Sequence, residues 1–206
     1  MASLQRFMGL GKHPAYDGAI AYFDAEQYSD AIPLFEMTLQ ECNDPTVQKL
    51  ARAYLAESYA KVGYKRAVQG NWASAYNYFT MATDYAPQYA DWWFQAGFAA
   101  YKQGDYASAQ SAFQQATQVN PTFARAWFGL GLAQYASGQH ETALETLQRW
   151  LVSMRLTNDQ FQNALELHQA GRFAEAQQAF EQFLQSAEDN FAEYIRWGDE
   201  AYQQGN

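Results

Sequence analysis

Apolar residues recur along this chain of 206 residues in a pattern that repeats at a nearly constant interval. Four evenly spaced glycines mark the repeat: Gly70, Gly104, Gly138 and Gly171. After each glycine, bulky and small residues alternate at steps of three and four, which places them on one face of a helix. In chain order these positions hold Trp72, Ala75, Phe79 and Ala82; Tyr106, Ala109, Phe113 and Ala116; His140, Ala143, Leu147 and Trp150; and Phe173, Ala176, Phe180 and Phe183. The pattern predicts an amphipathic helix after each glycine.

A second set of matched positions precedes two of these glycines. Its members are Trp93, Ala96, Gly97 and Ala100, which correspond to Trp127, Leu130, Gly131 and Gln134. Their spacing again indicates a helix, and Pro87 and Pro121, separated by the same interval, stand where one helix ends and the next begins. Each unit is therefore predicted to be a helix, a short turn and a second helix. One such pair cannot bury its apolar face alone, so the units are expected to stack.

This pattern resembles that of the tetratricopeptide repeat family. The residues that carry the resemblance are clearest in the unit 90–123: Trp93, Gly97, Gly104, Tyr106, Ala109, Phe113, Ala116 and Pro121. The first unit departs most, because Glu26 stands where the turn glycine is usual. The resemblance implies an all-α fold, a right-handed α-solenoid of antiparallel helix pairs. The predicted divisions are an N-terminal tail (1–11) and a single solenoid (12–206), with about five repeats (12–45, 46–89, 90–123, 124–156 and 157–190) and a C-terminal capping helix (191–206).

One segment is longer than its counterparts. Between Pro45 and Gly70 the only helix-breaking residue is Gly63, so we expect one continuous helix from about residue 46 to 69. Gly63 or Gly70 could serve as the turn glycine, which leaves two registers open. The added length either extends the packing or provides a contact surface around Tyr64, Lys65 and Arg66, and we favour packing. Asp44, Asn71 and Asp105 are expected to cap the helices that follow them.

The formal net charge of −9 is concentrated at the C-terminal end, where residues 157–206 hold nine acidic residues against two arginines. The chain lacks the basic stripe on which nucleic-acid affinity depends, so an RNA-binding protein is not expected. No apolar run is long enough to span a membrane, and the start of the chain does not resemble a secretory signal. With Cys42 as the only cysteine, we expect a cytoplasmic protein, and a bacterial one.

No catalytic or cofactor-binding motif is present in the sequence. His13, His140 and His168 are far apart along the chain, and each is expected to pack or to face solvent. No Cys/His spacing suits a metal, and no glycine-rich loop follows a predicted strand. We therefore expect neither an enzyme nor a protein that carries a cofactor or a metal.

The resemblance also implies a binding groove, because one stripe of the first helices lines the concave face in this family. The positions carried over from the family are Phe94, Phe98, Tyr101, Lys102, Phe128, Leu132, Tyr135, Phe161 and Leu165. Family members that clamp a peptide carboxylate use Lys, Arg and Asn there, so the many rings in this chain make that mode doubtful. We expect a protein-interaction scaffold that binds an apolar peptide or amphipathic helix.

Three interpretations of the aromatic stripe remain open: it binds a partner, it binds the chain's own first segment through Leu4, Phe7, Met8 and Leu10, or it packs between repeats. The alternative function is self-assembly into homo-oligomers through the N-terminal segment or the solenoid edges. The partner's identity does not follow from the sequence.

Overall fold

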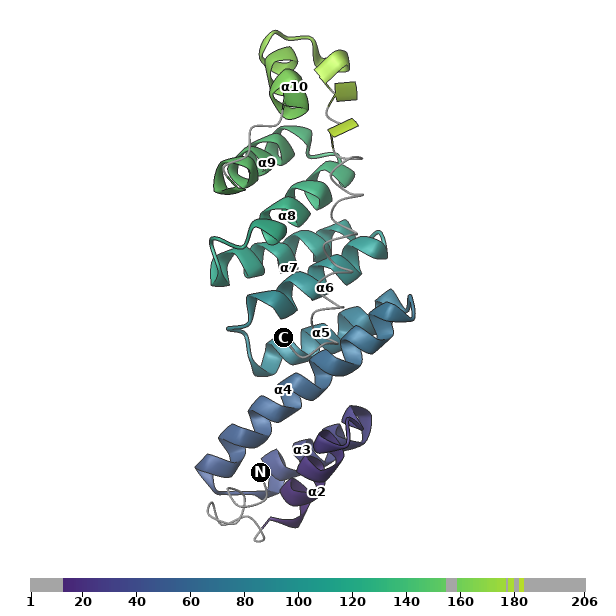
Figure 1. The fold of residues 1–206 in the computed structure, drawn as a ribbon, viewed down its shortest axis with the longest axis vertical. Coiled ribbons are helices and arrows are strands. Elements are labelled where there is room, and N and C mark those ends of the chain that lie inside the picture. The colour runs from purple at the N-terminus through teal and green to yellow at the C-terminus, as the bar shows by residue number, and fades with distance from the viewer. Residues whose placement is uncertain (1–12, 155–158, 177, 180–181, 184–206) are drawn as a thin grey trace. The chain divides into compact units, whose positions relative to one another are not determined.

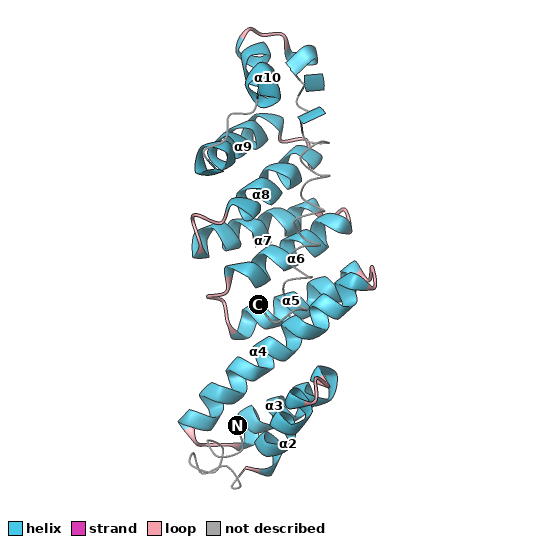
Figure 2. Ribbon diagram, viewed as in Figure 1, coloured by secondary structure: helices cyan, strands magenta, loops and turns pink. Residues whose placement is uncertain are grey.

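The fold consists of helices joined by short turns (Figures 1 and 2). A computed structural model describes residues 13–154, 159–176, 178–179 and 182–183. Among these residues no strand occurs, and the prediction of an all-α fold is confirmed. The helices are α2 (Pro14–Asp24), α3 (Tyr28–Glu41), α4 (Pro45–Val68), α5 (Trp72–Tyr85), α6 (Ala90–Lys102), α7 (Tyr106–Val119), α8 (Ala124–Ala136), α9 (His140–Met154) and α10 (Asp159–Gln169).

The chain divides into two compact units, Met1–Gly129 and Leu130–Asn206, and the boundary lies inside α8. In the first unit every helix from α2 to α6 packs against the helix that follows it in the chain. Figure 1 shows these helices running back and forth, as antiparallel pairs do. Packing between chain neighbours is the defining arrangement of an α-solenoid.

The core is built from the repeated positions of the apolar pattern. In α5 and α7 these are Ala75, Phe79 and Ala82, then Ala109, Phe113 and Ala116, and all six are buried. The equivalent Ala143 and Leu147 of α9 are also buried. A small residue on either side of a large one lets a neighbouring helix approach closely while the ring fills the space between them. The positions that repeat along the sequence are therefore the positions that form the core of each helix pair.

Each turn between the helices of a pair requires a left-handed residue. Gly70, Gly104, Gly138 and Gly171 have φ values of 71°, 79°, 83° and 73°. The amide that follows the glycine closes the turn by bonding back to a carbonyl five positions earlier, as in Asn71 N to Arg66 O and Asp105 N to Ala100 O, at 2.9 and 3.0 Å. Glycine is favoured there because a Cβ is disfavoured at positive φ.

The first turn lacks glycine and adopts the same conformation. Glu26 has φ 58°, and Gln27 N bonds to Tyr22 O at 2.9 Å. A left-handed non-glycine residue costs about 1–2 kcal/mol. We therefore expect Glu26→Gly to raise the free energy of unfolding by about 0.5–1 kcal/mol, after the larger chain entropy of glycine is subtracted. Urea denaturation followed by circular dichroism measures this change, and a loss of stability would contradict the strain assigned to Glu26.

The long helix predicted for residues 46–69 is confirmed as α4, with Asp44 as its cap. The Asp44 carboxylate accepts hydrogen bonds from the amides of Thr46 (2.8 Å) and Val47 (3.3 Å), which lower its pKa. Inside α4, Gly63 is helical and buried, and a Cβ there would lie 3.0 Å from the ring of Phe79. Gly63 is thus a close-approach glycine, one repeat before Gly97, and Gly70 is the turn glycine. The structure settles the register that the sequence leaves open.

Packing accounts for the extra length of α4. Its N-terminal half contributes Tyr54, whose ring lies 5.0 Å from that of Phe23 and is stacked 5.9 Å from that of Phe35. Its C-terminal half contributes Tyr64, with its ring 5.0 Å from that of Phe79. The helix therefore joins two aromatic clusters, one with α2 and α3 and the other with α5.

Two tryptophans are hydrogen-bonded to the repeated prolines. The indole Nε1 of Trp93 donates to the carbonyl of Pro87 at 2.9 Å, and Trp127 donates to Pro121 in the same way and at the same distance. Each bond ties the first helix of a unit to the connection before it and pairs the indole N–H, as a partly buried donor requires.

Several sequence predictions fall outside the described residues, among them the tail 1–11, the capping helix 191–206 and the suggestion that the first segment mediates self-assembly. The division of 12–206 into repeats and cap stays a prediction. No described helix combines the length and the apolar character needed to cross a membrane.

Candidate functional site

The structure buries most of the side chains predicted to line a groove. Tyr101, Tyr135 and Leu165 are half-buried and Lys102 is exposed, whereas five side chains are buried: Phe94, Phe98, Phe128, Leu132 and Phe161. The ring of Phe94 packs 5.6 Å from that of Phe113, and the ring of Phe161 packs 5.3 Å from that of Phe183. The expectation of an exposed aromatic wall is wrong for these five residues, because close packing places large side chains between helices. Whether any of the nine contacts a partner stays a prediction.

A different aromatic feature recurs at the turns. The last turn of the first helix and the start of the second each contribute one ring, five positions apart. The ring pairs are Phe23 with Tyr28, Tyr101 with Tyr106, Tyr135 with His140, and His168 with Phe173, at centroid distances of 5.2, 5.6, 4.6 and 5.3 Å. The left-handed turn residue brings the two positions together, so the turn geometry creates each pair. None of these eight rings is fully buried, in contrast to the core rings.

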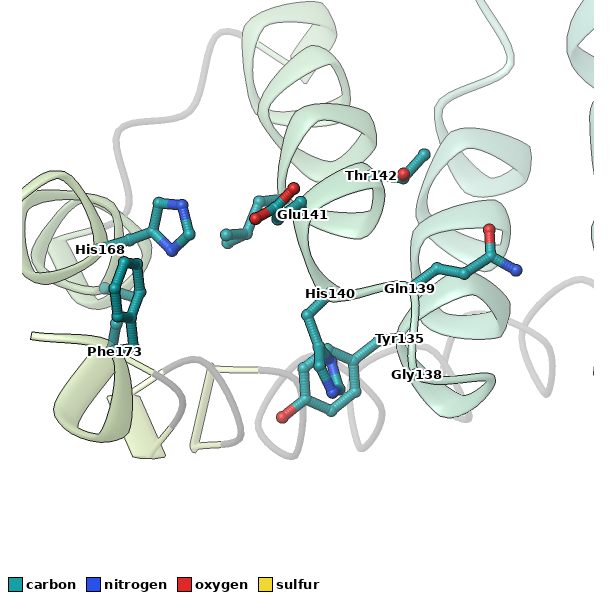
Figure 3. A pocket seen from close by; sticks show the side chains of 11 residues that line it. Tyr135, Gly138, Gln139, His140, Glu141, Thr142, His168 and Phe173 are labelled. Carbon is teal, nitrogen blue, oxygen red and sulfur yellow. The ribbon is translucent and has the colours of Figure 1, made fainter. Parts of the chain in front are cut away.

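In the second unit, two consecutive ring pairs border one pocket of about 470 Å³, which we call the turn pocket. Its lining comes from the end of α8, the turn after it and the start of α9, from α10, and from the helical residues 173–176 that follow: Tyr135, Gly138, Gln139, His140, Glu141, Thr142, Leu144, Ala164, His168, Phe173 and Ala176. Figure 3 shows Tyr135 and His140 on one side, His168 and Phe173 on the other, and Glu141 between them. Phe173 is 63% exposed, an unusual position for a large apolar ring.

The turn pocket carries one formal charge. Its described lining holds the carboxylate of Glu141, in the first turn of α9, and no lysine or arginine. Arg172, the residue before Phe173, is bonded to Glu175: its Nε donates to Oε1 at 2.8 Å, and a second bond links the same two groups. That pairing raises the pKa of Arg172 and lowers the pKa of Glu175. The pocket is therefore lined by aromatic rings, and the Glu141 carboxylate gives it a negative charge.

The pocket brings together residues that are distant in the sequence. His140 and His168 belong to successive repeats, and the sequence predicts only a packing or surface role for each. The missed signal is one further repeating column before the glycine, Tyr101, Tyr135 and His168, which pairs with the column Tyr106, His140 and Phe173 after it. Of the predicted groove residues, Tyr135 lies in the pocket lining.

A second cavity, of about 440 Å³, lies in the first unit beside the start of α2 and the end of α3. Its lining includes Cys42, whose Sγ lies 3.4 Å from His13 Nδ1 and accepts a hydrogen bond from the amide of Asp44 at 3.4 Å. Cys42 is buried, and the described residues contain no group of three or more His, Cys, Asp or Glu side chains that could hold a metal. These contacts tie the end of α3 to the cap of α4.

Residues 94–160 match the family model of the tetratricopeptide repeat. This segment of the chain carries tetratricopeptide repeats. The match begins in α6 and extends to the start of α10, so these repeats include the turn between α8 and α9 that forms one side of the turn pocket. A search of curated proteins finds no sequence match.

Solved structures of tetratricopeptide repeats share the fold. The Sgt2 domain from Aspergillus fumigatus is 22% identical with a TM-score of 0.50, and the alignment covers 58% of this chain and 83% of the other. The first repeat domain of Spaghetti (RPAP3), bound to an HSP90 peptide, is 24% identical with a TM-score of 0.50 and coverage of 57% and 94%. A MamA structure is 20% identical with a TM-score of 0.51 and coverage of 81% and 86%. At these identities the likeness supports the fold alone.

Proposed function

We propose that this tetratricopeptide repeat protein is a non-catalytic scaffold that binds a segment of another protein, and that the turn pocket is a binding site. The observation that carries the proposal is the pocket itself, bordered by two ring pairs and left open at Phe173. An aromatic cleft with a few polar groups is the usual form of a recognition site. The Spaghetti domain with the same fold has been seen with an HSP90 peptide, SRMEEVD, which supports peptide binding as a use of such repeats.

The binding mode proposed here differs from the clamping of a peptide carboxylate. That mode needs cationic side chains, and the described lining of the turn pocket supplies none. The rings instead offer apolar contact area at low entropic cost, as aromatic anchors do at protein interfaces. Affinity would come from side chains inserted between the two ring pairs.

Panning a library of random peptides against the full chain tests the proposal. We expect the selected peptides to bind the Phe173→Ser variant at least about fivefold more weakly, because removing a central interface ring usually costs more than about 1 kcal/mol. Phe173 is largely exposed, so the variant should retain its helix content by circular dichroism. Tyr89→Ser, which removes an exposed ring from the first unit, serves as the matched control and should leave binding unchanged. Equal binding by Phe173→Ser, or no selected peptide at all, would overturn the proposal.

A further inference from the structure

We infer that the turn pocket recognises a basic side chain, an arginine of a partner segment, which the two ring pairs and the Glu141 carboxylate would hold. This inference rests on the proposed function and names the chemistry of its ligand. The faces of aromatic rings attract cations, and the only formal charge in the described lining is negative. An anionic ligand would meet Glu141 without a compensating cation.

The first unit contains the same arrangement built from its own residues. The guanidinium carbon of Arg125 lies 5.4 Å from the ring centre of Phe94 and 5.2 Å from that of Phe123. A guanidinium nitrogen of Arg125 lies 3.8 Å from a carboxylate oxygen of Asp91. A cation beside two rings and one carboxylate thus occurs within this fold. In the turn pocket the rings and the carboxylate are present, and the cation would come from the partner.

Two other rings of the first unit also lie near cations, and one of them belongs to a ring pair. Lys61 Nζ lies 5.9 Å from the ring centre of Tyr28, a member of the first ring pair. Lys102 Nζ lies 5.4 Å from the ring centre of Phe98, which packs edge-on against Trp72 at the start of α5. The contact at Tyr28 shows that a ring of a turn pair can lie beside a long cationic side chain. The attraction of a cation to a ring face supports cation binding by the rings of the turn pocket.

Long-range charge favours the same ligand. Residues 130–206 hold eleven acidic residues against four arginines and no lysine, which is most of the chain's net charge of −9. A field of one sign attracts a basic partner and speeds its encounter. Arginine is preferred to lysine because its planar guanidinium stacks on a ring while donating two hydrogen bonds to a carboxylate. The carboxylate in the pocket and the net charge of this part of the sequence therefore favour the same ligand charge.

Nuclear magnetic resonance of the labelled full chain tests this inference with N-acetyl-argininamide as the probe. The titration runs at about pH 8, where an ordinary imidazole is neutral. We expect shifts at His140, Glu141 and Phe173, at least about fivefold weaker binding by Glu141→Gln, and unchanged binding by Glu145→Gln, an exposed acid one turn further along α9. N-acetyl-citrullinamide, which has the same shape without the charge, should bind at least about fivefold more weakly than the arginine probe.

Equal shifts with arginine and citrulline, stronger shifts with N-acetyl-glutamate amide, or full binding by Glu141→Gln would each overturn the inference. Peptide panning separates this failure from failure of the proposed function. Selected peptides that depend on Phe173 but contain no excess of arginine would leave the scaffold role standing and remove the basic ligand. If the selected peptides neither depend on Phe173 nor contain an excess of arginine, both proposals are wrong.

Discussion

Phe113→Ala is expected to lower the free energy of unfolding by about 3–5 kcal/mol, the range for removing a buried phenylalanine ring. Phe113 is 1% exposed, and its ring lies between two glycines of neighbouring helices. A Cβ on Gly97 of α6 or on Gly129 of α8 would come within 2.7 Å of this ring. The cavity left by the ring is bordered by helix backbone, which cannot collapse easily, so the cost should fall near the upper end.

Urea denaturation of the variant and the parent chain measures this loss. Gln114→Ala provides the matched control, because Gln114 is the next residue of α7 and its side chain is exposed. We expect the control to change stability by less than about 0.5 kcal/mol, as surface substitutions usually do. A loss below about 1 kcal/mol for Phe113→Ala would contradict the assignment of this ring to the core, since buried rings cost several times more.

Gly97→Ala is expected to destabilise the protein by about 1–3 kcal/mol, although alanine is the better helix former by about 1 kcal/mol. The added Cβ would lie 2.7 Å from Phe113 Cδ1 and 2.9 Å from Cγ and Cε1. The ring cannot retreat toward α8, because Gly129 is already in close contact on that side. Thermal and urea denaturation of the variant measure the net effect.

A double-mutant cycle isolates the cause. Once Phe113→Ala has removed the ring, Gly97→Ala should become neutral or stabilising, because only its helix propensity remains. If Gly97→Ala costs the same with and without the ring, the close approach of α6 to Phe113 is not the reason for the glycine.

The repeating columns could be predicted from the sequence because packing and period coincide. Phe79 and Phe113 are core residues in successive units for the same geometric reason, and one residue of each column identifies the rest. The two roles of glycine could not be separated in the long segment, because Gly63 and Gly70 look alike without coordinates. Backbone φ distinguishes them: Gly70 is left-handed, whereas Gly63 is helical and faces Phe79.

Exposure was the part that the sequence did not determine. Phe94 and Tyr135 both belong to the predicted groove stripe of the first helices, yet Phe94 is buried and Tyr135 borders a pocket. The difference arises from the neighbours of each ring, since Phe94 packs against Phe113 and Phe123 and Tyr135 packs against His140. Such neighbours come from other helices and turns, so a helical stripe alone does not predict which rings a partner can reach.

The continuity of α4 has a consequence for how the N-terminal end opens. A linear array ordinarily loses its terminal pairs one at a time, because each unit contacts only the next. Here α4 covers α2 and α3 with one part and packs on α5 with another, so release of the terminal pair would uncover part of a helix that the rest of the unit still holds. Amide hydrogens on both sides of Tyr59 should therefore exchange with solvent at a common rate, and fraying should be suppressed at this end of the first unit.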